Sequence, residues 1–429
     1  VIVSRLSRVV DEVRVTPRRC ACITYTNTAV YEIDERLRHH IQPGDDAFYD
    51  ICTIHSFCLN HIFRPFSYLI KGYANGFKVL TPESSDFDAI VRATLAEVGI
   101  NNPTFKDFED FSQLRVSSDG RPVGIALQRG VLNERMARSY WARIRARGYI
   151  DFANIIYYAL VLLRKRSEIL SHVAAKFAYI LVDEFQDTTD LQVEILSKVA
   201  DAGLTKFLLV GDPAQSIFGF AGARPDLADP FAAHIGARTD IQLTGNFRSS
   251  GLIVADANRL LPRTPAMDAV GSNRNAPHLT TWRQGSTAFE VIADHFLPTL
   301  EGLGIPQGDA AILAPSWFSL FPLGRQLRDY GISIIGPGAR PYRRNRLFAP
   351  LAEQVCAQII EPKPEAITSV ERSLFNTILD ASGRAHFDIF SYSGRAVVYR
   401  LIHRSQELYA SRMGAIDWLE LASEAFSES

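Results

Sequence analysis

The sequence lacks the features that mark membrane-spanning, disulfide-rich and strongly charged proteins. No run of 18 or more apolar residues occurs, so no membrane-spanning helix is expected. Five cysteines in 429 residues are too few for a disulfide framework and lack the paired spacing of a zinc site, which favours a reduced, cytoplasmic protein. The formal net charge is -1, so any contact with nucleic acid must come from local basic patches.

The glycine-rich phosphate loop G-x-x-x-x-G-K-[ST] is absent as well. The chain begins with valine, and residues 1–14 already have the pattern of a helix, so we expect a piece of a longer protein. What the sequence does contain is 47% hydrophobic residues, which is ample for globular cores, and its length predicts two to four domains.

Short apolar runs that alternate with helical patterns indicate the fold. Strands are predicted at CACIT (20–24), YILVDE (179–184), KFLLVGD (206–212) and IQLTGNF (241–247). Strands that are apolar throughout and separated by helices predict an α/β fold, with a parallel sheet covered on both faces. Ligands bind such sheets beyond the carboxyl ends of the strands, which is where polar residues such as Asp183 follow.

Helix signals surround these strands. Residues 151–166 have the pattern of a long apolar helix, and Thr189 with Gln192 has the spacing of a capping box for the next one. A second α/β unit is expected after the fourth strand, with further strands at 310–314 and 332–336.

A long insertion between the first two strands is rich in arginine. Residues 115–147 hold eight arginines against Asp119 and Glu134. A helix in this segment has one apolar stripe, so we expect the arginines to fan outward, either toward duplex DNA or a partner or simply into solvent. The stripe comprises Ala137, Tyr140, Trp141 and Ile144.

The first chemical signal is the strand that ends in Asp183 and Glu184. In nucleoside triphosphatases an aspartate at this place holds Mg²⁺, and the following glutamate polarises the attacking water. The pair alone is weak, because many strands end in a solvated acidic turn. Extended to LVDEFQDT, it is much more specific.

Two further motifs follow. In LLVGDPAQSIFGFAGA (208–223), Gln215 is placed to sense a γ-phosphate, while Phe218 and Phe220 could stack on a base. A glycine-rich loop with core phenylalanines is the alternative. In TGNFRSS (244–250), Arg248 could act as an arginine finger and Phe247 could stack on adenine, although a loop arginine is more often a solvated charge.

These motifs, in this order, resemble the UvrD/Rep/PcrA family of superfamily 1 (1A) DNA helicases. ITYTNTAVYEIDERL (23–37), TIHSF (53–57) and GYIDFANIIYYALVLLR (148–164) add to the resemblance, which covers 1–260 well and 280–361 loosely. It implies tandem RecA-like P-loop NTPase domains with parallel sheets and helical insertions. It also implies ATP and Mg²⁺ as cofactors, and single-stranded and partly duplex DNA as partners.

The resemblance implies a role for each matching position. Asp183 would hold Mg²⁺, Glu184 would be the catalytic base, and Gln215 would contact the γ-phosphate. Arg248 would be the first arginine finger, with Phe247 at the adenine. The positions expected to contact single-stranded DNA are Tyr25, Thr26, Asn27, His55, Phe218 and Phe220. For His55, a packing role is equally open.

The chain departs from the family pattern in several places. Phe247 stands where the family usually has a tyrosine, Phe220 replaces a tryptophan, and Ala221 replaces an arginine. The phosphate loop and the late helicase motifs are missing. We therefore expect the native protein to extend at both ends, with a degenerate pseudo-helicase as the alternative.

The expected domains follow from these motifs. They are residues 1–61 (first part of RecA-like domain 1A), 62–150 (mostly helical 1B-like insertion), 151–243 (second part of 1A), 244–362 (first part of RecA-like domain 2A) and 363–429 (helical 2B-like insertion).

The expected function is that of an ATP-dependent 3′–5′ single-stranded DNA translocase or helicase in DNA repair, recombination or anti-phage defence. The short insertions resemble those of compact members such as the helicase subunit of the Gabija anti-phage system, which works beside a nuclease. The main alternative is a non-unwinding DNA-binding sensor or scaffold that regulates a partner nuclease. A subunit with a fused nuclease and a small-molecule kinase are further alternatives.

Overall fold

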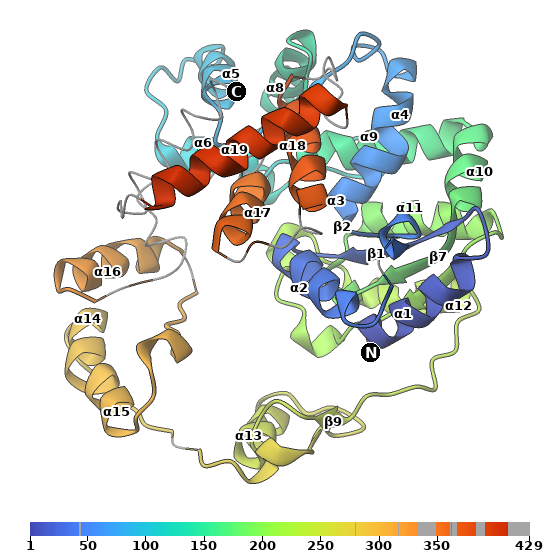
Figure 1. Cartoon of the computed structure of the whole chain (residues 1–429). Coiled ribbons are helices and arrows are strands. Elements are labelled where there is room, and N and C mark those ends of the chain that lie inside the picture. Colours follow the sequence, from blue (N-terminus) through green and yellow to red (C-terminus); the bar gives the residue numbers. More distant parts are fainter. Residues whose placement is uncertain are drawn as a thin grey trace. The chain divides into compact units, whose positions relative to one another are not determined.

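The computed structural model describes residues 1–42, 44–278, 280–315, 317–332, 334, 349–360, 362, 367–382 and 391–410. Figure 1 shows the course of the chain. Its contacts divide it into two compact units. One comprises Val1–Asp240 with Asn345–Ser429, and the other comprises Ile241–Arg344. The finer division into five parts stays a prediction.

A parallel sheet with the strand order β2-β1-β7-β8 forms the centre of the first unit. Its strands are β1 (Arg19–Thr24), β2 (Tyr49–Thr53), β7 (Phe177–Val182) and β8 (Lys206–Leu209). The strands predicted at 20–24, 179–184 and 206–212 are confirmed. β2 was not predicted, because Asp50 interrupts its apolar pattern.

Both faces of the sheet are covered, as the apolar strands predicted. On one face, Cys20, Cys22 and Leu181 pack against α1 (Ile2–Val13) and α2 (Asn27–Arg38). Burial raises the pKa of both thiols, to about 12 for Cys20.

The other face carries the larger core. Ala21, Ile23 and Ile180 are buried there among helices that follow in the chain. These are α3 (Ile54–Phe57), the helical segment Cys58–Phe63, α4 (Arg64–Phe66), α9 (Phe152–Lys165), α10 (Ser167–Lys176), α11 (Asp190–Asp201) and α12 (Ala228–His234). The long apolar helix predicted at 151–166 is therefore α9, which begins at the capping side chain of Asp151. The capping box of Thr189 and Gln192 opens α11, as predicted.

The insertion has a core of its own. The predicted stripe residues, together with Met136, are buried along α8. Its elements are β3 (Lys78–Val79), α5 (Ser85–Ala96), α6 (Phe105–Ser112), β4 (Arg115–Val116), β5 (Pro122–Val123), α7 (Ile125–Gln128), α8 (Glu134–Ala146) and β6 (Tyr149–Ile150). β3 pairs with β6, and β4 pairs with β5.

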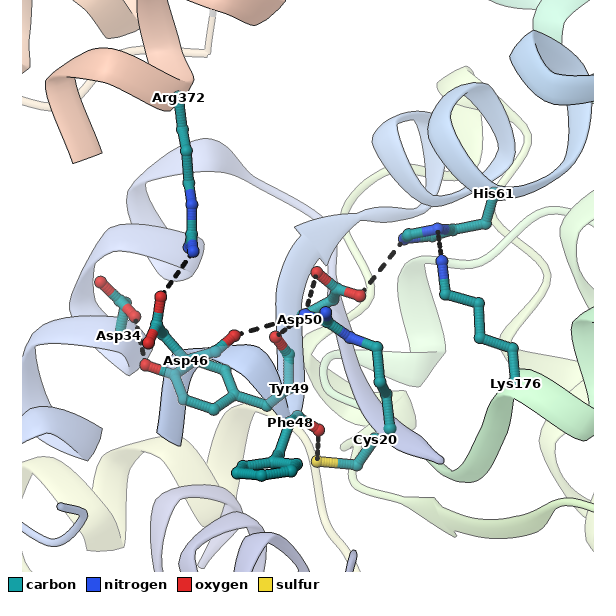
Figure 2. A network of polar contacts seen from close by, with 10 residues as sticks. Cys20, Asp34, Asp46, Phe48, Tyr49, Asp50, His61, Lys176 and Arg372 are labelled. Atoms are coloured by element: carbon teal, nitrogen blue, oxygen red, sulfur yellow. Dashed lines mark hydrogen bonds and ion pairs between the residues drawn. The ribbon is translucent and has the colours of Figure 1, made fainter. Parts of the chain in front are cut away.

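A network of polar contacts lies at the amino ends of the strands (Figure 2). Asp50 binds Arg19 at 3.0 Å and lies 3.6 Å from His61, whose other ring nitrogen is 3.0 Å from Lys176 Nζ. Burial lowers the pKa of His61 to about 3, so the ring is neutral at physiological pH. Farther along, Arg372 contacts Asp46 at 2.5 Å. The network lies at the edge of the sheet opposite the carboxyl ends of the strands.

The second unit departs from the predicted β–α–β pattern. Only Gly245–Asn246 (β9) of the strand predicted at 241–247 is extended, and it pairs with β10 (Asp268–Ala269). No strand forms at 310–314, where Leu313 is 91% exposed. A short apolar run does not by itself fix a strand, so that prediction is wrong. Most of 332–336 lies outside the described residues.

Helices account for most other described elements after residue 240. In the second unit they are α13 (Gly251–Leu260), which the side chain of Ser250 caps as predicted, α14 (Ala288–Val291), α15 (Leu297–Gly302) and α16 (Trp317–Asp329). The C-terminal helices are α17 (Ala349–Ile360), α18 (Ile367–Ser382) and α19 (Tyr392–Ala410), which share a small apolar core. Within the described part of the chain, no helix has the length and apolar character needed to cross a membrane.

Candidate functional site

The carboxyl ends of the four parallel strands meet at one edge of the central sheet. Tyr25 directly follows β1, His55 follows β2, Asp183 follows β7, and Gln215 lies in the loop after β8. Four stretches that are far apart in the sequence therefore contribute to one edge.

Backbone hydrogen bonds continue the sheet pairing past the end of β7. The amide of Asp183 donates to the carbonyl of Ile23 at 2.8 Å, and the amide of Phe185 donates to Val210 at 3.0 Å. Between them Glu184 has φ 52 and ψ 44, which is left-handed; no other non-glycine residue in the described ranges has a positive φ. Such a conformation costs about 1–2 kcal/mol, so the turn is held by its neighbours.

Gln186 connects the acid pair to the next loop. It is 2% exposed, its Nε2 donates to Glu184 Oε2 at 2.6 Å, and its Oε1 accepts from the amide of Asp212 at 3.0 Å. Gly211 passes so close that a Cβ there would lie 2.7 Å from Gln186 Oε1. Gln186 stands inside the acidic motif but was not among the predicted site residues.

The acid pair borders a pocket of about 470 Å³ that residues of α1 and α2 also line. Burial, followed by the charge of Glu184, raises the pKa of Asp183. Two adjacent carboxylates in a partly buried place suit a divalent cation. The described residues contain no cluster of three or more potential protein ligands. A Mg²⁺ ion held at Asp183 would need water and phosphate oxygens as its other ligands, which Mg²⁺ usually keeps.

Gln215 lies on the short turn Pro213–Gln215, which Asp212 caps. Asp212 Oδ1 accepts from the amide of Ala214 at 3.0 Å, and its Oδ2 accepts from Gln215 Nε2 at 2.8 Å. Since Asp212 also binds Gln186, a continuous series of polar contacts runs from Glu184 to Gln215. Gln215 itself is exposed, so its amide is accessible to a ligand.

Three rings follow one another beside this loop, and we call them the aromatic row: Tyr25, Phe218 and Phe220. The ring centroids of Tyr25 and Phe218 are 4.7 Å apart, and those of Phe218 and Phe220 are 6.0 Å apart. Phe220 is 62% exposed and therefore is not a core phenylalanine. Burial and the charge of Asp187 raise the pKa of Tyr25. Successive accessible rings suit stacking of single-stranded bases.

The remaining positions that were expected to contact DNA also have structural roles. Thr26 caps α2 by accepting from the amide of Ala29 at 3.1 Å, and Asn27 is the first residue of that helix. The ring of His55 packs edge-on against Phe152, with centroids 5.8 Å apart. Thr26 and Asn27 are exposed, whereas His55 is half-buried. Contact with DNA stays a prediction for all three.

Phe247 and Arg248 belong to the second unit. Asn246 Oδ1 accepts from the amides of Arg248 and Ser249 at 3.0 and 2.8 Å, which fixes the turn after β9. Asn273 Nδ2 donates to the carbonyl of Arg248 at 3.0 Å. The side chains of Phe247 and Arg248 are exposed within their unit.

Arg115 of the insertion does not fan outward. Arg115 is half-buried, and its Nη1 donates to the carbonyl of Ala221 at 2.7 Å, one residue after Phe220. In contrast, Arg135 and Arg138 are exposed, as expected. The sequence gives no signal for the Arg115 contact, since the two partners are 106 residues apart.

The parallel sheet therefore carries an acid pair, a glutamine loop and accessible rings at one edge, where ligands bind in α/β folds. This arrangement agrees with a RecA-like fold. The family model described as UvrD/REP helicase N-terminal domain matches residues 1–235. The chain belongs to the UvrD/Rep helicase family, in superfamily 1A.

Curated relatives agree with this assignment. ATP-dependent DNA helicase Rep of Escherichia coli is 28% identical over 275 residues, which are 62% of this chain and 39% of that protein. ATP-dependent DNA helicase PcrA of Bacillus subtilis is 26% identical over 290 residues, 66% of this chain and 37% of that protein. A probable DNA helicase II homolog of Mycoplasma capricolum is 26% identical over 275 residues, which are 61% of this chain and 37% of that protein. The chain therefore spans about two fifths of the length of these relatives.

Proposed function

We propose that this chain carries the nucleotide-hydrolysing and DNA-binding core of an ATP-dependent single-stranded DNA translocase or helicase with 3′–5′ direction. Glu184 activates the attacking water, Asp183 holds Mg²⁺, and Gln215 contacts the γ-phosphate. Arg248 and Phe247 of the second unit supply the arginine finger and the ring at the adenine. Single-stranded DNA lies along the aromatic row with Thr26, Asn27 and His55.

The observation that carries this proposal is the loop shared by the two halves of the site. Polar contacts lead from Glu184 through Gln186 and Asp212 to Gln215, and Phe218 follows three residues later. A shift of Gln215 at the nucleotide therefore moves the rings that hold the bases. This is the coupling that a stepping motor requires.

The proposal also involves components other than the residues named so far. Phosphate binding needs a glycine-rich loop that the 429 residues do not contain, so hydrolysis requires a polypeptide that includes one. Bound Mg²⁺ would neutralise phosphate charge in the transition state. The exposed arginines of the insertion would contact duplex DNA or a nuclease partner. The activity would serve DNA repair, recombination or anti-phage defence in the cytoplasm.

The test is ATP hydrolysis by a polypeptide that contains this chain together with such a loop, with and without oligo(dT). We expect stimulation by the oligonucleotide in the wild type and in Glu35→Gln, which changes an exposed glutamate of α2. Glu184→Gln should abolish hydrolysis while leaving oligonucleotide binding intact, because the aromatic row is unchanged. Oligonucleotide binding without stimulated hydrolysis would instead identify a non-unwinding sensor or scaffold.

A further inference from the structure

We propose that Arg115 is a positioning residue of the DNA site, which ties the insertion to the loop of Phe218 and Phe220 and so sets where the bases stack. This inference rests on the proposed function. It means that the insertion helps to position the aromatic row, which is a separate role from any contact of its outward arginines with duplex DNA.

The backbone of Arg115 is firmly held by the insertion. Its neighbours Leu114 and Val116 are 4% and 6% exposed and belong to the core of the insertion. Because successive side chains of a strand point to opposite sides, Arg115 points away from that core. The turn of the same hairpin is held on α9, where Arg164 Nη1 donates to the carbonyl of Ser118 at 2.6 Å.

The guanidinium lies directly over the loop. Besides the 2.7 Å hydrogen bond to the carbonyl of Ala221, its Nη1 lies only 1.5 Å from where a Cβ on Gly222 would be. Gly222 also has φ +86, which disfavours any side chain. The amides of Ala221 and Ala223 both donate to the carbonyl of Phe218, at 2.8 and 3.1 Å. The segment that Arg115 contacts is therefore hydrogen-bonded to the backbone of a residue in the aromatic row.

The contact also brings a charge that the loop lacks. No basic side chain occurs from Gln215 to Ala223, whereas Arg115 remains charged although burial lowers its pKa. The charge of Asp190 opposes that lowering. The guanidinium is therefore a cation held against the loop of Phe218 and Phe220.

The first test measures oligo(dT) affinity by fluorescence anisotropy in a double-mutant cycle. We expect Arg115→Ala to weaken binding by about fivefold to tenfold, in the range of one ordinary lost hydrogen bond, because Arg115 acts through the loop and not on the DNA itself. Arg121→Ala, an exposed arginine of the same hairpin, removes equal charge and should have little effect. In a Phe220→Ala background, Arg115→Ala should add much less, because it acts through the ring. Fully additive effects with a smaller salt slope would mean direct phosphate contact and would overturn the positioning role.

A second readout does not depend on DNA. Hydrogen exchange of the amides of Ala221 and Ala223 should accelerate in Arg115→Ala but not in Arg121→Ala. Arg115→Lys, which keeps the charge but loses the planar fork, should restore affinity and protection only partly. If wild-type protein fails to bind oligo(dT), the proposed function fails, and exchange alone then decides whether Arg115 holds the loop. If the hydrogen exchange of these two amides is unchanged in Arg115→Ala, the inference is wrong.

Discussion

The left-handed backbone at Glu184 predicts that glycine is a more stable replacement there than alanine, which is the reverse of their order within a helix. Glu184→Ala and Glu184→Gly both remove the carboxylate and its contact with Gln186, so those losses cancel between them. What differs is the backbone: alanine keeps a left-handed cost of about 1–2 kcal/mol that glycine avoids. Glycine lowers the free energy of unfolding by about 0.4–1 kcal/mol relative to alanine, because it gives the unfolded chain more conformational entropy. We therefore expect Glu184→Gly to be more stable than Glu184→Ala by roughly 0.5–1 kcal/mol.

Equilibrium urea unfolding of the variants measures this difference. Glu35, exposed within α2, provides the matched pair, because in a helix alanine is favoured over glycine by about 1 kcal/mol. The order of the two variants should therefore reverse between positions 184 and 35. Alanine being the more stable substitution at both positions would show that Glu184 does not hold this conformation in solution.

Further predictions concern stability and DNA binding. Arg18 donates to the carbonyls of Ala174, Ala175, Phe177 and Leu204 at 2.7–3.0 Å, so Arg18→Ala should cost about 2–3 kcal/mol in urea unfolding, while the exposed Arg8→Ala should cost almost nothing. A bidentate contact from Arg14 lowers the pKa of buried Asp45. Asp45→Asn should therefore destabilise by about 2 kcal/mol near neutral pH. Its deficit relative to wild type should shrink as the pH falls below about 4, because the stabilisation from a lowered carboxyl pKa disappears there; a constant deficit would refute this cause. Phe220→Ala should weaken oligo(dT) binding by about 1–3 kcal/mol without lowering the unfolding midpoint. Ile217→Ala changes a side chain on the same loop that is 72% exposed, and it should leave the affinity unchanged.

The sequence predicted those elements whose signal is local. β1, β7 and β8 are apolar runs closed by polar residues, and the capping box of α11 is a four-residue pattern, so each could be recognised without tertiary information. The stripe of α8 was equally visible, because helical periodicity repeats within one element.

The predictions failed where residues distant in the sequence determine the local structure. β2 contains Asp50, whose burial is tolerated because Arg19 binds it from the neighbouring strand. The run at 310–314 is apolar enough for a strand but has no strand pairing in the structure. In the site, the acidic motif predicted where the carboxylates lie. It could not predict the left-handed turn at Glu184 or the contact of Arg115, which both depend on neighbouring segments.

The buried thiols make this chain convenient for site-specific labelling. Alkylating dyes react with thiolates, and burial raises the pKa of Cys20, Cys22, Cys52 and Cys58. Cys356 is then the native thiol to replace before a new cysteine is introduced at an exposed position. Fluorophores placed on the insertion and beside the aromatic row would report their separation in real time as nucleotide and oligonucleotide are added.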